Sequence, residues 1–138
     1  MTDGTRGDGR QHRRLTCTVC PKGCAVDVVL HNGAIESLEG AACRRGRESC
    51  IQEVLDPRRM LSTTVRLRHA DRPLLPVRTC VPIPRDRIPQ AMGQLREIAV
   101  EAPVRMGDVV FRDLAGTGID VVAAESAPRQ DDEGSDRP

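Results

Sequence analysis

The segment "CTVCPKGCAVDVVLHNGAIESLEG", residues 17–40, joins three closely spaced cysteines to an alternating apolar stretch. Val26, Val28 and Leu30 recur at every second position, which predicts a half-buried strand. Asn32-Gly33 follows, and this pair favours a two-residue turn with positive φ at both positions. The apolar pattern then resumes, so the segment predicts a β-hairpin.

This hairpin returns the chain to the cysteine cluster and brings a fourth cysteine to it. Cys17, Cys20, Cys24 and Cys43 have the spacing C-x2-C-x3-C-x18-C. Four thiolates are the usual ligands of a 4Fe-4S cluster or of a tetrahedral zinc ion. A tight three-cysteine loop with one remote ligand favours the cluster, because structural zinc sites usually present two separated C-x2-C pairs. Gly23 would let the backbone fold closely around a cluster, with N–H groups pointing at its sulfides.

Other interpretations of the cysteines stay open. The same four thiolates would also make a closed zinc site in a structural or interaction module without redox activity. Cys17 and Cys20 have the spacing of a thiol-exchange pair but lack its strand-to-helix setting. Cys50 and Cys80 lie outside the ligand pattern and are expected to be small buried side chains. The alternative for Cys50 is that it substitutes for Cys43 or binds a second metal.

The composition allows one modest domain. The chain has 138 residues, and each of the segments 1–14 and 126–138 contains a single apolar residue, so we expect both to be disordered tails. The remaining segment, 15–125, is too short to enclose a large organic cofactor as well as a core. With one Phe and neither Trp nor Tyr, that core must rely on aliphatic side chains. A metal site would help to stabilise it.

The sequence predicts an α+β fold: a small single domain with an N-terminal metal-binding β-hairpin, two helices and a C-terminal β-hairpin. It has a cysteine-cluster subdomain at 15–56 and an α+β remainder at 57–125. The expected elements after the first hairpin are a helix at 46–56, a strand at 60–68, an extended edge or polyproline segment at 74–84, a helix at 87–100 and strands at 109–113 and 119–124. The prolines at 76, 82 and 84 argue against a central strand at 74–84. Asp86 is the expected N-cap of the second helix.

Charge and motifs exclude several functions. Lys plus Arg number 21 and Asp plus Glu 20, and aromatic residues make up 1% of the chain, so no nucleic-acid partner is expected. The N-terminus lacks an apolar signal-peptide region and no long apolar window follows, so we expect a cytoplasmic protein without direct membrane insertion. In the cytoplasm, clustered cysteines more often bind metal or do redox work than form structural disulfides. No catalytic residue is predicted, because the chain carries no nucleophile, acid–base or phosphate-binding motif.

The middle of the chain is rich in arginine. Such a group is either a solvated surface or a docking face for an acidic partner beside the cluster. Its members are Arg44, Arg45, Arg47, Arg58, Arg59, Arg66, Arg68 and Arg78. His12, His31 and His69 lie in polar contexts and are expected to be solvated rather than metal ligands.

The cysteine segment resembles a known cluster-binding element. "CTVCPKGCAVDVVLHNGAIESLEG" followed by "CRRG" is similar to the N-terminal 4Fe-4S segment of molybdopterin-dependent oxidoreductases. In that family a basic residue after the last cysteine lies between cluster and pterin, and Arg45 is the matching residue here. The chain is too short to hold a molybdopterin, so that cofactor is not expected.

A second resemblance extends over residues 15 to 124. "CTVCPKGC", "CRRG", "LSTTVR", "LPVRTCVPIPRDRI", "APVRMGDVV" and "GTGIDVVA" together resemble a bacterial and archaeal family, domain of unknown function 1667. Its members accompany flavin-dependent dehydrogenases similar to anaerobic glycerol-3-phosphate dehydrogenase. The resemblance implies an iron–sulfur electron-transfer accessory protein or subunit, inactive alone, that works with such a dehydrogenase.

Overall fold

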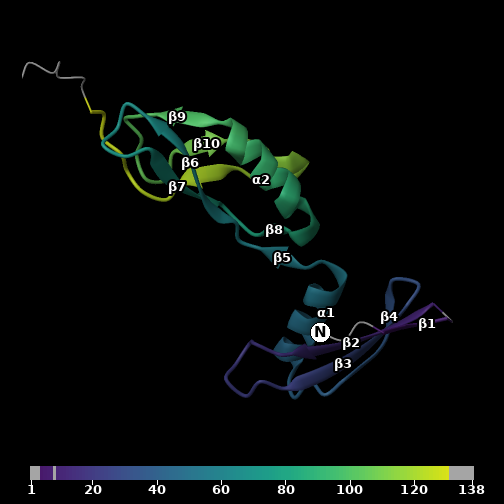
Figure 1. The fold of residues 1–138 in the computed structure, drawn as a ribbon. Helices are drawn as coiled ribbons and strands as arrows, with labels where there is room; N and C mark the ends of the chain where they lie inside the picture. The colour runs from purple at the N-terminus through teal and green to yellow at the C-terminus, as the bar shows by residue number, and fades with distance from the viewer. Residues whose placement is uncertain (1–3, 8, 131–138) are drawn as a thin grey trace, which may run out of the picture. The chain divides into compact units, whose positions relative to one another are not determined.

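A computed structural model describes residues 4–7 and 9–130, which form a mixed α+β fold with two α-helices (Figure 1). The chain divides into two compact units, Met1–Pro57 and Arg58–Pro138. The sequence predicts one domain with two parts, and the boundary between the units lies one residue from the expected boundary between those parts. Among the described residues, neither helix has the length and apolar character needed to cross a membrane.

The N-terminal unit consists of an antiparallel four-stranded sheet and one helix. The strands have the order β1-β2-β3-β4. The elements are β1 (Gly4–Arg6), β2 (Arg10–Thr16), β3 (Ala25–His31), β4 (Ala34–Glu39) and α1 (Arg44–Leu55). One face of the sheet and one face of α1 share a small core. Its buried residues are Cys17, Val26, Val28, Leu30, Leu38, Cys50 and Val54.

The predicted first hairpin is confirmed as β3 and β4. Asn32 and Gly33 form its turn with φ values of 53° and 80°, as the two-residue turn requires. Ile35 and Leu38 are three residues apart, so strict alternation would place them on opposite faces. The register shifts next to Leu30 of β3, and this irregularity pairs Ile35 with Leu30 and Leu38 with Val28. Both side chains therefore face the core.

The N-terminal segment differs from the disordered tail expected for residues 1–14. Residues 1–3 and 8 lie outside the described residues, but β2 pairs with β3 along its whole length, from Arg10 opposite His31 to Thr16 opposite Ala25. Strand β2 is polar in composition. Backbone hydrogen bonds to its partner strand β3 hold it in the sheet. Arg10 also donates two hydrogen bonds of 2.8 Å to the Glu36 carboxylate.

The C-terminal unit contains a five-stranded sheet, a two-stranded pair and one α-helix. The larger sheet has the order β10-β11-β7-β6-β9, and all neighbours are antiparallel except β6 and β9. Its strands are β6 (Ser62–Arg68), β7 (Leu74–Thr79), β9 (Ala99–Glu101), β10 (Val109–Phe111) and β11 (Val121–Ala123). The small pair is β5 (Arg58–Arg59) and β8 (Ile83–Pro84), and the helix is α2 (Ile88–Glu97).

Strand β7 corrects the prediction that residues 74–84 form an edge or polyproline segment. It lies in the middle of the sheet, between β11 and β6, although it contains Pro76. The Pro76 carbonyl accepts a hydrogen bond from the Ala124 N–H at 2.9 Å, one residue beyond the end of β11. N–H and C=O of one residue point to the same side of an antiparallel strand, so the missing Pro76 N–H falls where the β11 ladder has already ended.

Helix α2 follows the prediction in its position and apolar face but not in its ends. Ala91 and Leu95 are buried against the sheet. A 3-10 turn over Arg85–Arg87 precedes the helix and contains Asp86, so the predicted N-cap was wrong. The helix ends at Glu97 rather than Val100, because Ala99–Glu101 become β9 and pair with β6.

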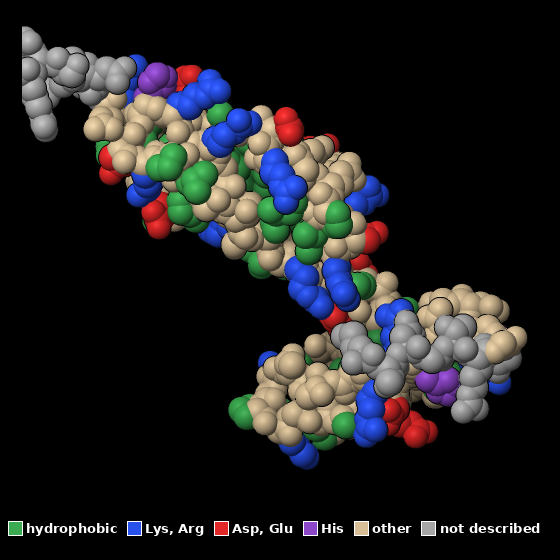
Figure 2. Space-filling view, in the orientation of Figure 1, with side chains coloured by type: hydrophobic (Ala, Val, Ile, Leu, Met, Phe, Trp, Pro, Cys, Tyr) green, Lys and Arg blue, Asp and Glu red, His purple; other side chains and the backbone are tan. Residues whose placement is uncertain are grey.

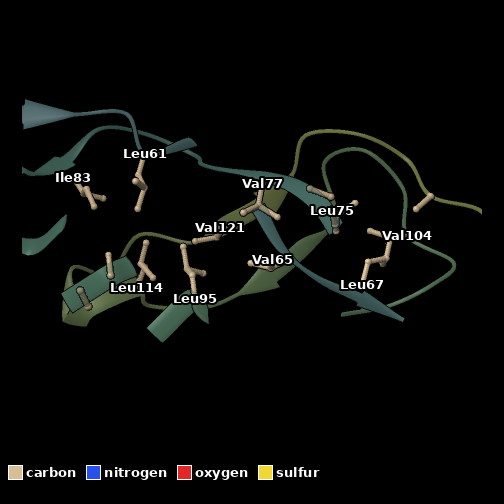
Figure 3. Packing of buried hydrophobic residues seen from close by; sticks show 14 of the residues in the cluster. Leu61, Val65, Leu67, Leu75, Val77, Ile83, Leu95, Val104, Leu114 and Val121 are labelled. Atoms are coloured by element: carbon tan, nitrogen blue, oxygen red, sulfur yellow. The ribbon is translucent and has the colours of Figure 1, made fainter. Parts of the chain in front are cut away.

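The core of the C-terminal unit lies between α2 and the larger sheet (Figure 3). Aliphatic side chains fill it, as the sequence predicts; Leu75, Ile83 and Leu114 are fully buried. The predicted C-terminal hairpin is present as β10 and β11, both shorter than expected. Residues 131–138 of the expected C-terminal tail lie outside the described residues. Its first part is not a tail: Ala127 is buried and pairs with Val104.

Gly40 lets the chain turn from β4 toward α1. Its φ is +97°, and a Cβ there would clash with the Ala25 carbonyl oxygen. We predict that Gly40→Ala destabilises the N-terminal unit by the left-handed penalty of roughly 1–2 kcal/mol plus about 1–3 kcal/mol for the clash. The midpoint of urea unfolding, followed through NMR amide signals of β3, measures this loss.

Gly107→Ala is the matched control for Gly40→Ala. Gly107 has a similar φ of +92°, but nothing lies within 4 Å of the Cβ position. Only the conformational penalty should apply there, measured on signals of β11. Equal losses of stability in the two variants would contradict the steric role of Gly40.

Candidate metal centre

The loop with the first three cysteines closes the pair β2–β3. Cys17 directly follows β2 and Cys24 directly precedes β3. The Cys17 N–H donates to the Cys24 carbonyl at 2.8 Å, which adds one rung beyond the last paired residues of the sheet. Gly23 has φ of +62°, a conformation that suits glycine. The cysteines thus occupy the loop of a hairpin that the sequence did not reveal, because β2 is too polar to be recognised as a strand.

Cys43 begins helix α1. It is the N-cap, with φ of −146°, and its sulfur accepts a hydrogen bond from the Gly46 N–H at 3.3 Å. The Cys43 carbonyl also accepts from the Arg47 N–H at 3.0 Å. This cap explains why α1 starts at Arg44 rather than at the predicted Gly46.

Gly46 brings the loop and the helix together. It is buried in the first turn of α1, and a Cβ at this position would lie 3.0 Å from the Cys17 sulfur and 3.5 Å from the Cys43 sulfur. Because glycine has no side chain, the Cys17 sulfur can approach this backbone position closely, with the Cys43 sulfur at an ordinary contact distance from it. The first and last cysteines of the predicted ligand set are therefore neighbours, although 26 residues separate them in sequence.

The other two predicted ligands are placed by the loop. Cys24 packs partly buried against the N-terminal core, and Cys20 is exposed. Within residues 4–7 and 9–130, no three His, Cys, Asp or Glu side chains converge on one point that could hold a metal ion. The structure thus places the sulfurs of Cys17 and Cys43 near each other but does not bring all four sulfurs together. The donor chemistry and the space at Gly46 fit a thiolate-bound centre.

Cys50 is the cysteine that sequence reasoning left aside. It is buried on α1, one helical turn after Gly46, as expected for a small apolar side chain. Burial raises the pKa of the Cys50 thiol, and the neighbouring Cys17 raises it further. Gly46 and Cys50 are four residues apart, so they lie on the same face of the helix. This spacing was the feature of the sequence from which the position of Cys50 beside Cys17 could have been inferred.

The remaining cysteine and the histidines lie apart from this arrangement. Cys80 is exposed at the end of β7 in the C-terminal unit, so the expectation that it is buried was wrong. Its N–H instead donates to the Asp120 carbonyl at 3.0 Å. His12, His31 and His69 are exposed, as expected.

The arginines form two separate groups. Arg44, Arg45 and Arg47 belong to the N-terminal unit and surround the start of α1, whereas the other five belong to the C-terminal unit. Arg44 is paired with Glu48 at 2.8 Å, and Arg47 donates to the Leu38 carbonyl at 3.2 Å. Figure 2 shows Lys and Arg side chains on the visible face of each unit, with acidic and hydrophobic side chains among them. Only the first group lies beside the cysteines within its own unit.

Gly46 offers a direct test of this geometry. We predict that Gly46→Ala leaves α1 folded, since alanine favours a helix by about 1 kcal/mol over glycine, but displaces the Cys17 sulfur. We expect the purified variant to contain much less metal than the wild-type chain. Metal analysis by mass spectrometry measures the loss. Gly93→Ala in α2 is the matched control, because nothing lies within 4 Å of its Cβ position. Equal metal content in both variants would contradict the proposed role of Gly46 in placing the Cys17 sulfur.

Comparison with known proteins identifies the family. The model of the family described as "Protein of unknown function (DUF1667)" matches residues 44–125, a shorter range than the expected 15–124. The match starts one residue after Cys43, so the four candidate ligands precede it. An NMR structure of the Clostridium perfringens protein CPE0013 aligns with 21% identity and a TM-score of 0.49, over 59% of this chain and 96% of that chain. No curated protein matches the chain. Because the family model covers more than half of it, the chain belongs to the DUF1667 family.

Proposed function

We propose that the chain is an iron–sulfur electron-transfer accessory protein or subunit that works with a flavin-dependent dehydrogenase. Cys17, Cys20, Cys24 and Cys43 would hold one 4Fe-4S cluster. When bound, such a cluster supplies a one-electron relay. The chain's own residues bind it, limit its contact with water and set the charge around it. The substrate chemistry belongs to the dehydrogenase.

The observation that carries this proposal is the meeting of Cys17 and Cys43 at Gly46. Glycine at a buried helical position costs about 1 kcal/mol relative to alanine, so its presence calls for a packing reason. Here the reason is room for the Cys17 sulfur, 3.0 Å from the Cβ position, whereas the Cys43 sulfur at 3.5 Å is at an ordinary contact distance. Two remote cysteines beside each other, with two more on the adjoining loop, favour a shared inorganic centre over isolated thiols.

The surroundings of the cysteines favour a negatively charged centre close to the surface. The N-terminus of α1 and the nearby Arg44 and Arg45 would stabilise thiolates and added electrons. Cys20 and Cys43 are exposed, so one side of the centre would be open to a redox partner. Cys17 is buried, which gives the other side a low-dielectric anchor.

A zinc-binding structural or interaction module is the second candidate, and the small core of the N-terminal unit favours it. Among the described residues, seven buried ones form that core, so a metal would contribute to its stability. The same four thiolates would serve. Zinc carries no redox chemistry, so the two candidates differ in metal content and in colour.

The dehydrogenase partner is supported by the family resemblance and by charge. An exposed group of arginines beside the cysteines would attract an acidic surface and orient it for electron transfer. We propose a flavoprotein similar to anaerobic glycerol-3-phosphate dehydrogenase as that partner. No nucleic acid and no direct membrane insertion are part of the proposal, and a cytoplasmic location remains its expectation.

Anaerobic purification tests the metal. We predict a brown protein with iron and sulfide in equal amounts, whose visible absorption bleaches with dithionite. Alanine replacement of Cys17, Cys20, Cys24 or Cys43 should remove most of the iron, because a cluster with three protein ligands is exposed and labile. Cys80→Ala is the control and should keep the wild-type iron content. Colourless wild-type protein with one zinc would support the second candidate and exclude electron transfer through this site.

Salt dependence tests the docking surface. Replacement of both Arg44 and Arg45 by Gln should weaken association with the reduced flavoprotein and remove most of its dependence on ionic strength. Surface plasmon resonance measures the effect at about 50 to 500 mM NaCl, because charges become increasingly screened over this range. Arg68→Gln in the C-terminal unit is the control. Unchanged binding in the double variant would remove these arginines from the interface.

A further inference from the structure

We propose that the Cys50 thiol donates a hydrogen bond to the Cys17 sulfur and thereby sets the electron density on this ligand. Cys50 would then be a positioning residue of the centre rather than a ligand or a mere core residue. This inference rests on the proposed function, since it assigns Cys50 a role toward one of the four proposed ligands. It applies to any metal that Cys17 binds.

The first step is the packing of Cys17. Its sulfur lies over α1, where a Cβ at Gly46 would be 3.0 Å away, and Cys50 follows one helical turn later on the same face. Cys50 and Cys17 belong to the same buried cluster, and Cys17 is close enough to Cys50 to raise the pKa of its thiol. The Cys17 side chain therefore lies against the face of α1 that carries Gly46 and Cys50.

The direction of the proposed hydrogen bond between Cys50 and Cys17 follows from the chemistry of a metal-bound sulfur. A metal-bound cysteine sulfur has lost its proton and can only accept. In the pair formed by Cys17 and Cys50, the donor must then be Cys50. Only 4% of Cys50 and 7% of Cys17 are exposed, and their apolar neighbours Val26 and Val54 are buried as well. Water does not compete for the Cys50 proton in such a setting, so the hydrogen bond is expected to persist.

The third step is the effect on a metal. A hydrogen bond to a ligand sulfur withdraws electron density from the sulfur and stabilises added negative charge. In an iron–sulfur cluster it raises the reduction potential. In a cobalt-substituted thiolate site it lowers the energy of the sulfur lone pairs, which moves the sulfur-to-cobalt charge-transfer absorption to shorter wavelength. Loss of the donor should reverse both effects.

The experiment uses the full-length chain loaded anaerobically with Co²⁺, a probe for thiolate ligands that does not depend on the native metal. Cys50→Ala removes the donor, whereas Cys50→Ser keeps an O–H donor of smaller size and guards against a folding defect in the alanine variant. We expect a shift of the charge-transfer band to longer wavelength in Cys50→Ala and an intermediate position in Cys50→Ser. The control Cys80→Ala, at an exposed cysteine outside the ligand set, should match the wild type.

The outcomes separate this inference from the proposed function. Cobalt binding by the wild type with the same band position in Cys50→Ala overturns the role of Cys50 and leaves the four-thiolate centre intact. A shift as large in Cys80→Ala also overturns it. A wild-type chain that binds no Co²⁺ removes the centre, and the role of Cys50 with it. Where the native protein contains iron, the reduction potential of Cys50→Ala should be more negative than that of the wild type; an equal potential counts against the inference.

Discussion

The arrangement of the cysteines in the N-terminal unit depends on the close approach of the Cys17 sulfur to Gly46. This contact joins the loop that closes β2 and β3 to the first turn of α1. A Cβ at residue 46 would lie 3.0 Å from the Cys17 sulfur, so the sulfur would have to shift by a few tenths of an ångström. Among the described residues, sheet and helix also share a small core, to which Cys17 and Cys50 belong.

The parts of the fold that sequence predicted are those determined locally. Asn32-Gly33 specifies its own turn, and the apolar face of α2 appears at helical spacing whatever it packs against. The parts that it missed depend on a distant partner. Strand β2 is polar in its own sequence and is held by β3, and Pro76 fits a central strand only because β11 ends beside it.

The candidate site was predictable to the same extent. Spacing identified Cys17, Cys20, Cys24 and Cys43, and the hairpin explained how the chain returns. Spacing could not reveal that Cys17 lies beside Cys50, because that contact arises from the packing of α1 on the loop. It also suggested that Cys80 is buried like Cys50, whereas Cys80 follows the last residue of β7 and faces solvent. Whether a cysteine near the end of a strand is buried depends on the residue at which the strand ends, and the pattern of apolar residues does not show that residue.

We propose that the cysteines around Gly46 share one iron–sulfur cluster. X-ray absorption at the iron and zinc edges of the anaerobically purified wild-type protein tests this most directly, because it reports both the atoms bonded to a metal and the metals beyond them. We predict iron bonded only to sulfur, with other iron atoms as the next neighbours. Zinc bonded to four sulfurs at about 2.3 Å, without iron, would contradict it.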